Sequence, residues 1–385
     1  MLNLADLMEK AVSATGLDDF GEPTFHDGLN KLIDAFNGEA ELSDLGAVMA
    51  EQAVLEPLTN RLLINAWIDE HPEVEQERVE RPIVIVGMSR SGTTALSHLL
   101  GKDPELRSLL RFEALCSVPP PESATVFTDP RYLQSVQADE MSEIVFPELR
   151  AIHHDPPDAP VECNTLLSHE FVSTVYTTVY HLPSYADWIT STDLTDAYAY
   201  HERILKLLQS RMPGTWNLKG PQHGFAMQTL RRRYPDATLI ATHRDPAVCA
   251  ASTASLMAYL HSHTSTKSRS NELGEMAASL IEKCSNGLIE DYRSHRGDDR
   301  MLHVAYRDLV GDPIGTVRRL YDQMNRPLTE QAESAMIAHT RTRTQHRYGK
   351  HHYLPTNYGL DVAALKERYH EYRESFDVDI EGADW

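Results

Sequence analysis

Apolar residues recur at helical spacing through the first eighty positions of the chain. One such series begins near the start and another runs through residues 55–63. We therefore predict a helical region over residues 1–80. A run of charged residues and prolines over residues 71–82 separates it from the rest of the chain. The positions that carry the spacing are Leu4, Leu7, Met8, Val12, Leu55, Leu58, Leu62 and Leu63.

Beyond this region the pattern changes to short apolar runs that alternate with helical periodicity. Strands that alternate with helices predict an α/β fold, with a central parallel sheet flanked by helices. Apolar runs at residues 82–87, 238–242 and 301–305 predict the strands, and periodic segments at 94–100, 247–260, 271–295 and 313–324 predict the helices.

The chain is expected to divide into two parts. Residues 81–385 would form the α/β domain, with the helical region 1–80 packed on its core. Within the domain, residues 114–200 are expected to form an irregular helical insertion, because proline is frequent and periodicity is weak between residues 119 and 183. This insertion is a candidate lid over an acceptor.

The first apolar run leads into a turn of small residues and then into a helix. Gly87 and Gly92 stand at the spacing of the phosphate-binding motif G-x-x-x-x-G-K-[ST], but Thr93 takes the place of the lysine. Backbone N–H groups in such a turn point into one concavity, and the following helix adds its positive end, so the loop binds a phosphate. A nucleoside triphosphatase would lack its lysine clamp here. The cation of this loop is Arg90, which suits a single 5′-phosphate with another anionic group beyond it.

The segment from Arg90 to Thr94 resembles the 5′-phosphosulfate loop of the sulfotransferases that use 3′-phosphoadenosine-5′-phosphosulfate (PAPS). Its arginine is similar to that of the bacterial and tyrosylprotein branches. The resemblance implies a fold like that of the P-loop NTPases, and contact of Arg90 with the bridging oxygen or the sulfuryl group. The donor-binding residues implied in this loop are Ser89, Arg90, Ser91, Gly92, Thr93 and Thr94.

A second candidate anion site follows the apolar run at residues 238–242. Arg244 stands at the end of the predicted strand, and Ser252 lies eight residues further, two turns into the predicted helix. The two can converge on one anion, because a guanidinium offers a planar fork of donors and serine adds a hydroxyl. The pair resembles the segment that binds the 3′-phosphate of PAPS in this family.

Two other stretches resemble donor-binding segments of the family less closely. Tyr306 looks like the tyrosine at a strand end that lies near the adenine base. Arg347 and Lys350 occupy the place of the family's C-terminal basic loop, although the usual R-K-G signature is missing. Residues 340–360 hold four basic residues and no acidic one, which suggests a local anionic ligand.

Sulfuryl transfer requires cations where charge develops and a base for the acceptor proton. Besides Arg90, the second candidate cation is Lys219, in a segment that resembles the family's short lysine loop. His223 in the same segment is one candidate base. Glu113 is the other, because it follows the phosphate loop at about the distance where the tyrosylprotein and heparan branches place a glutamate. We favour Glu113 narrowly, since Arg90 aligns the chain with an arginine-loop branch.

Composition narrows the class of partner. The formal net charge of −21 argues against a nucleic-acid partner. No segment approaches the roughly 20 apolar residues of a membrane helix, and residues 1–10 lack the pattern of a signal peptide, so we expect a cytoplasmic protein that is not integral to a membrane. The four cysteines form no CxxC pair and suggest reduced thiols. No metal is expected, because the adjacent histidines lack a third ligand at useful spacing.

The resemblance therefore implies a sulfotransferase that moves a sulfuryl group from PAPS to a hydroxyl or an amine of a small-molecule or lipid acceptor. The transfer would be in line and without a metal, and would release 3′-phosphoadenosine-5′-phosphate (PAP). A non-catalytic PAP-binding protein remains an alternative, as does a P-loop kinase, which the missing lysine disfavours. The sequence does not identify the acceptor, and a homo-oligomer is left open.

Overall fold

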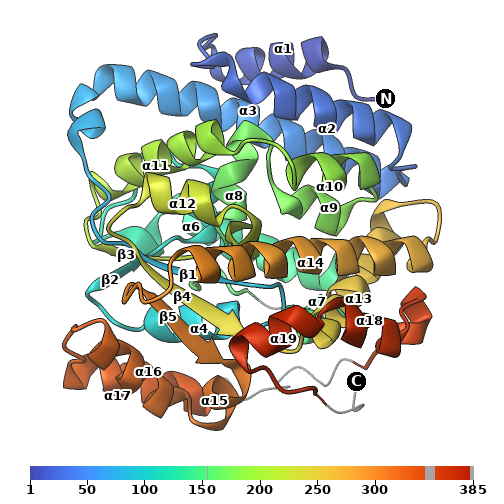
Figure 1. Ribbon diagram of the computed structural model, residues 1–385. Coiled ribbons are helices and arrows are strands. Elements are labelled where there is room, and N and C mark those ends of the chain that lie inside the picture. Colours follow the sequence, from blue (N-terminus) through green and yellow to red (C-terminus); the bar gives the residue numbers. More distant parts are fainter. Residues whose placement is uncertain (154, 343–351, 382–385) are drawn as a thin grey trace.

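A parallel sheet forms the centre of the structure, a computed structural model that describes residues 1–153, 155–342 and 352–381 (Figure 1). The strands are β1 (Ile83–Gly87), β2 (Leu106–Ser108), β3 (Thr215–Lys219), β4 (Thr238–His243) and β5 (Met301–Ala305). Their order is β2-β3-β1-β4-β5, and every pair is parallel. The carboxyl ends of all strands therefore meet at one edge of the sheet.

Helices cover both faces of this sheet, as the fully buried sequence of β1 requires. They are α4 (Thr93–Leu100), α12 (Met227–Arg233), α13 (Pro246–Thr264), α14 (Ser270–Ser294), α15 (Tyr306–Gly311), α16 (Pro313–Gln323) and α17 (Glu330–Thr342), and α18 (Val362–Arg368) and α19 (His370–Phe376) follow. Ile83 and Ile85 pack with α4, α16 and α17 on one face, and Val84 and Val86 pack with α13 and α14 on the other. The predicted α/β fold is thus confirmed.

The three predicted strands and the four predicted helices agree with the structure to within a few residues, whereas β2 and β3 are absent from the prediction. β2 has only three residues. β3 carries polar residues at buried positions, which hide its apolar pattern. Asn217 is one of them, and its Nδ2 donates to Ser97 O and Ser108 Oγ, both at 3.0 Å.

Three helices precede the sheet and lie at one end of the molecule (Figure 1). They are α1 (Leu4–Thr15), α2 (His26–Gly38) and α3 (Asp44–Glu70). Their buried apolar side chains belong to the same cluster as those of α13 and α14. Residues 1–80 are thus mainly helical, while the division of the chain at residue 80 stays a prediction.

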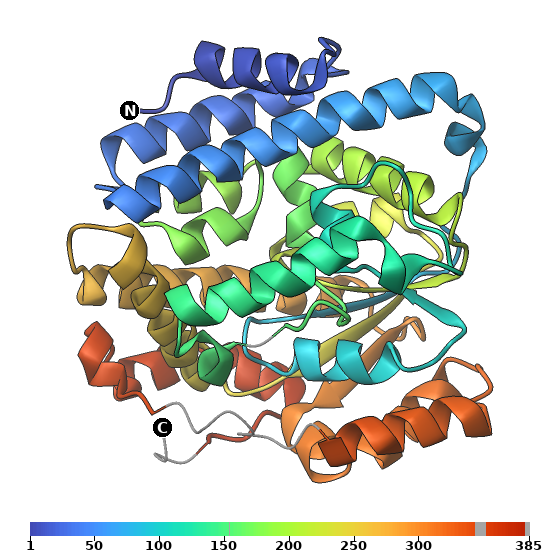
Figure 2. The ribbon, with the colours of Figure 1, turned by 180° about the vertical axis from the view of Figure 1, so that it is seen from behind.

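The stretch between β2 and β3 consists of helices of 4 to 16 residues joined by irregular segments (Figure 2). These helices are α5 (Arg111–Leu115), α6 (Pro130–Val145), α7 (Leu149–Ile152), α8 (Asn164–Leu167), α9 (Thr174–Val179), α10 (Pro183–Ile189) and α11 (Thr195–Gln209). Single 3-10 turns occur at Pro23–Phe25, Pro72–Gln76, Val126–Thr128, Ser168–Glu170, Pro221–Phe225 and Pro355–Tyr358. None of the helices in the described ranges has the length and apolar character needed to cross a membrane.

A buried ion pair ties α3 to this stretch. Arg61 Nη1 lies 2.5 Å from Glu170 Oε1, and neither side chain is more than 3% exposed. The guanidinium of Arg61 also lies 4.2 Å from the ring centres of Phe25 and Tyr200. Removal of one partner would leave the other charge buried and unpaired, which is costly.

We expect Arg61→Met to lower the free energy of unfolding by about 3–5 kcal/mol, because Glu170 loses its buried counter-charge. Urea denaturation followed by circular dichroism measures this loss. Lys10→Met is the control, since it breaks an exposed pair with Glu51 and should cost less than about 1 kcal/mol. A loss for Arg61→Met as small as that of the control would contradict the assigned role.

Candidate active site

The loop between β1 and α4 requires glycine at two positions. Gly87 and Gly92 have φ angles of +148° and +99°. A Cβ atom on Gly87 would lie 2.5 Å from Thr242 Oγ1, and one on Gly92 would lie 2.9 Å from Tyr306 Cδ2. Ser91 fastens the loop to β4, because its Oγ lies 2.7 Å from Thr242 Oγ1 and from Met88 O. The loop is therefore held in one shape, with the amino end of α4 beside it.

Arg90 leaves this loop and reaches α13 and α7. Its Nε donates to Ser252 Oγ at 3.1 Å, and its Nη2 donates to Ile152 O at 2.7 Å. Its Nη1 lies 3.5 Å from His153 Nδ1. Ser252, predicted to bind the same anion as Arg244, is thus bonded to Arg90 in this structure.

Arg244 lies directly beside Arg90. Its Nη1 donates to Arg90 O at 3.1 Å, and its Nε and Nη2 each donate to the carboxylate of Glu381 at 2.9 Å. The guanidinium lies 4.1 Å from the ring centre of Tyr306. The structure therefore brings together Arg90, Arg244, Ser252 and Tyr306, because β1 and β4 are neighbours in the sheet.

Lys219 ends β3 on the other side of β1, in register with Ile85. Its side chain is fully buried, and Nζ donates to Thr94 Oγ1 at 2.9 Å. Two carboxylates face it, with Nζ 3.8 Å from Asp155 Oδ2 and 3.9 Å from Glu162 Oε1. The predicted lysine thus lies next to the first turn of the loop helix, among acidic groups from the insertion.

Asp155 collects three basic side chains around one carboxylate. Besides Lys219, His153 Nε2 lies 3.1 Å from Oδ2 and His98 Nε2 lies 3.4 Å from Oδ1. Burial alone would raise the pKa of Asp155, but Lys219 and the two histidines hold it well below its usual value. Among the described residues, no group of three or more possible ligands is arranged to hold a metal ion.

A cavity of about 950 Å³ opens onto the loop, the insertion and α13. Its lining includes the loop residues Ser89, Arg90, Gly92, Thr93 and Thr94 together with Glu162 and Asn164. Apolar side chains in the lining include Met49, Phe146, Val175, Val179, Leu256 and Leu260. Arg244 and Tyr306 also line this cavity.

Neither predicted base lines this cavity. Glu113 is fully buried in an ion pair with Arg107, whose two terminal nitrogens each bond one carboxylate oxygen, and it also accepts the N–H of Leu110 at 2.8 Å. His223 is buried too; its Nδ1 lies 2.6 Å from the hydroxyl of Tyr198, and burial lowers its pKa to about 3. Both residues have suitable positions in the sequence, but both are buried with local partners and neither reaches the surface of the cavity.

Other site residues fall outside the prediction or outside the described part of the chain. Asp155 and Glu162 have no predicted role, because they lie in the irregular insertion. The adjacent histidines before Asp155 are visible in the sequence. Their pattern indicates only a possible metal site, and it does not predict the contacts of Asp155 with Lys219 and His98. Arg347 and Lys350 lie outside the described residues.

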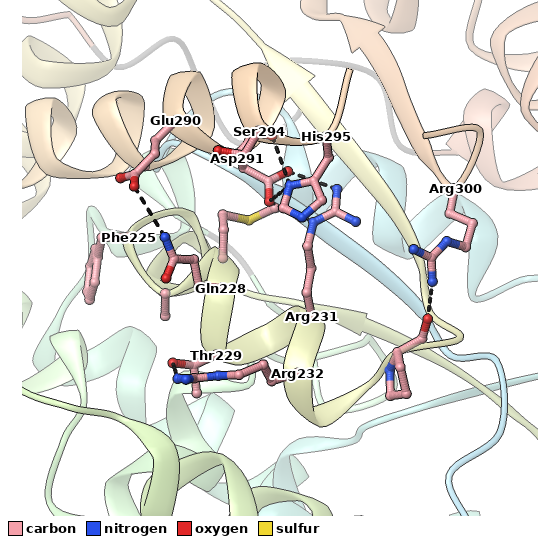
Figure 3. A pocket seen from close by; sticks show the side chains of 14 residues that line it. Phe225, Gln228, Thr229, Arg231, Arg232, Glu290, Asp291, Ser294, His295 and Arg300 are labelled. Carbon is pink, nitrogen blue, oxygen red and sulfur yellow. Dashed lines mark hydrogen bonds and ion pairs between the residues drawn. The ribbon is translucent and has the colours of Figure 1, made fainter. Parts of the chain in front are cut away.

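A second cavity, of about 580 Å³, lies at the amino ends of β4 and β5 (Figure 3). Arg231 contacts both Asp291 and Asp298, each with an N–O distance of 2.6 Å, and Arg300 also pairs with Asp298. Carboxylates thus neutralise Arg231 and Arg300, two of the three arginines that line this cavity. The lining of this second cavity includes neither the loop after β1 nor the amino end of α4, so we assign it no ligand.

Comparisons with known proteins agree with this geometry. The sulfotransferase family model matches residues 82–330. The omega-hydroxy-beta-dihydromenaquinone-9 sulfotransferase Stf3 of Mycobacterium tuberculosis (strain CDC 1551 / Oshkosh) is 27% identical over 253 residues, which cover 63% of this chain and only 62% of that protein.

Two crystal structures resemble the whole chain. Sulfotransferase STF9 from Mycobacterium avium has a TM-score of 0.90 at 31% identity and covers 99% of this chain and 98% of its own. Sulfotransferase STF1 from Mycobacterium tuberculosis H37Rv has a TM-score of 0.85 at 32% identity. The match covers 96% of this chain and 99% of the STF1 chain. The chain belongs to the sulfotransferase family. The resemblance first seen in the loop is therefore confirmed at the level of the family.

The environment of Asp155 predicts a pH effect on stability. Its folded pKa lies well below the unfolded value of about 3.9, so its contribution is present above that value and is lost as the pH falls toward the folded pKa. The difference in unfolding free energy between the wild type and Asp155→Asn should therefore shrink as the pH falls below about 4.

Urea denaturation at a series of pH values measures this difference. Asp322→Asn, which alters an exposed carboxylate on α16, is the matched control. A difference that stays constant down to pH 3, or that grows as the pH falls, would contradict the predicted ionisation of Asp155.

Proposed function

We propose that this protein transfers a sulfuryl group from PAPS to a hydroxyl group of an apolar acceptor and releases PAP. The main support is the contact between the two candidate anion sites. Arg244 donates to the carbonyl of Arg90 at 3.1 Å, and Arg90 donates to Ser252 at 3.1 Å. One nucleotide with a 5′- and a 3′-phosphate can therefore reach both sites.

The residues present fit such a nucleotide. Glu381 already occupies the fork of Arg244 with its two oxygens, so the fork accepts an oxyanion in the geometry that a phosphate also offers. The ring of Tyr306 lies between this fork and Gly92, where a Cβ would be too close. These contacts support a donor site that runs from the loop to Arg244.

Each part of the site has a role in this proposal. Backbone N–H groups of the loop and the first turn of α4 would hold the 5′-phosphate, and Arg244 would hold the 3′-phosphate. The bound donor supplies an activated sulfuryl group. Arg90 and Lys219 place positive charge next to the loop, where negative charge develops on the leaving oxygen. Thr94 orients Lys219 through their 2.9 Å hydrogen bond.

The apolar residues of the cavity lining support an acceptor with a substantial apolar part. Six apolar side chains from α3, α6, α9 and α13 and their flanks line the cavity. The relative from Mycobacterium tuberculosis is named for an omega-hydroxylated dihydromenaquinone, which is also apolar with a hydroxyl group. We propose an acceptor of this general kind, a hydroxylated apolar small molecule or lipid.

The proposal that the protein is an enzyme and the proposal that it is cytoplasmic rest on different observations. A purely PAP-binding protein has no need of a fully buried lysine between two carboxylates, so Lys219 favours an enzyme. A cytoplasmic location fits the cysteines, which are free thiols in this structure and would stay reduced there.

Transfer from labelled PAPS to a panel of hydroxylated apolar compounds tests the proposed reaction. Wild-type protein should label at least one of them, and Arg90→Ala should reduce the rate by about 100-fold or more, because a cation at the reacting group is lost. Lys10→Met serves as the active control. Absence of labelled product from every acceptor, together with absence of PAP binding, would overturn the proposed function.

Donor binding tests the fork of Arg244 separately. We expect Arg244→Ala to weaken PAP binding by about 10- to 100-fold, since a charge-assisted contact to the 3′-phosphate is lost. Glu381→Gln should strengthen binding by about 3- to 10-fold, because PAP would displace a neutral amide in place of a carboxylate. Isothermal titration calorimetry measures both.

Glu371→Gln provides the control for this pair, since Glu371 lies on α19 in an exposed contact with Arg293. Its affinity for PAP should equal that of the wild type. Unchanged affinity in Arg244→Ala would remove Arg244 from the donor site, and weaker binding in Glu381→Gln would show that Glu381 assists the donor.

A further inference from the structure

Helix α6 of the insertion turns apolar side chains toward solvent. Ser135 is the only buried residue of this helix, whose residues 130–145 are all described. Leu133 is half exposed, Met141 is 57% exposed and Ile144 is 73% exposed. Residues spaced by eight and eleven positions lie on the same side of a helix, so these three side chains form one stripe. Figure 2 shows α6 in front of the sheet, on the outside of the molecule.

The acidic residues of α6 lie on another side of the helix, in ion pairs. Asp139 and Glu143 both pair with Arg150 of α7, and the side chain of Asp139 is only 16% exposed. A surface helix normally turns its apolar residues to the core and its charged residues to water. In α6 a carboxylate faces inward while Ile144 faces solvent, so the outer side of the helix is suited to an apolar partner.

The stripe adjoins the first cavity at the carboxyl end of α6. Ser142 and the following Phe146 line that cavity. Met141 and Val145 are their neighbours in the sequence, and both are exposed. The exposed apolar surface of α6 is therefore continuous with the lining of the cavity that we propose for the acceptor.

Two other elements extend this surface. Val175 of α9 lines the cavity and is also exposed to solvent. On α3, Met49 lines the cavity, and the preceding residue, Val48, is 69% exposed. Exposed apolar side chains of α3, α6 and α9 thus adjoin the lining of one cavity. Apolar patches of this kind on a polar surface mark sites that bind a protein or a membrane.

Charge narrows the choice of partner. Within the fully described helix α6, Glu140 is the one charged residue among those that are exposed. The chain as a whole has a formal net charge of −21, which opposes contact with an anionic bilayer and with a second copy of the chain. A zwitterionic bilayer carries no net charge and takes up apolar side chains at its surface. It also dissolves the kind of apolar acceptor that the cavity lining supports.

We propose that α6, with the adjacent parts of α3 and α9, docks on the surface of a zwitterionic lipid bilayer, from which the acceptor enters the cavity. The choice of a bilayer rests in part on the proposed function. Met141, Ile144 and Val48 enter the interface between head groups and acyl chains. A few side chains give a weak, reversible contact, and the apolar part of the acceptor passes into the cavity without crossing water.

Flotation of the full chain with phosphatidylcholine vesicles tests this surface, in the absence of PAPS and acceptor. The wild type should float with the vesicles. The double variant Met141→Gln and Ile144→Gln should partition about 10-fold less or weaker still, because two side chains no longer leave water on binding. Glu140→Gln is the matched control, since it places the same residue on the same helix and keeps the apolar stripe, and it should bind at least as well as the wild type.

Turnover provides a second measurement. Neither Met141 nor Ile144 lines the cavity, so the double variant should keep its melting temperature and sulfate a monomeric, water-soluble acceptor within about twofold of the wild-type rate. With an acceptor embedded in limiting phosphatidylcholine vesicles, its rate should fall by about 10-fold, as its partition does.

Several outcomes would overturn the proposal. One is a wild type that does not bind these vesicles, and another is equal partition of the wild type and the double variant. Binding that appears only when phosphatidylglycerol is added would mean an electrostatic contact elsewhere. A dimer that the double variant loses in sedimentation velocity, without vesicle binding, would make the stripe an interface between copies. Failure to sulfate any water-soluble acceptor, with vesicle binding intact, would contradict the proposed function instead.

Discussion

The parallel pairing of β3, β1 and β4 positions the cations of the site. Register between β1 and β4 ends at Gly87 and Thr242, so the loop after β1 and Arg244 leave the sheet next to each other. Pairing of β1 with β3 brings Lys219 to the same edge from the other side. Segments that lie far apart in the sequence thus place Arg90, Arg244 and Lys219 around one loop.

Positive charges gathered in this way require negative partners, and this acidic chain supplies them itself. Glu381 pairs with Arg244, and Asp155 and Glu162 face Lys219. In the proposed reaction these carboxylates have different fates. Glu381 yields its place to a phosphate, and Asp155 remains as a fixed counter-charge. The same electrostatic demand therefore underlies donor binding, stability and catalysis.

Much of the fold could be predicted because β1, β4 and β5 are apolar and the helices are periodic. β3 escaped prediction, since Asn217 and Lys219 are polar residues whose partners come from distant segments. The same limit applies to the site. Glu113 has a suitable position in the sequence, but Arg107, six residues earlier, captures it in the core. Glu162 has no predicted role, because it reaches Lys219 through backbone hydrogen bonds of its neighbours Val161 and Cys163 to the distant residues Leu109 and Lys219.

The proposed donor site requires that one nucleotide connect the loop with Arg244, and a crystal structure of the protein with PAP examines this requirement. We expect the 5′-phosphate over the loop at the amino end of α4, and the 3′-phosphate in the fork of Arg244, in the place of the Glu381 carboxylate. A complex with PAP bound elsewhere, or with Glu381 still in the fork and the 3′-phosphate in solvent, would rule out a single nucleotide site of this kind.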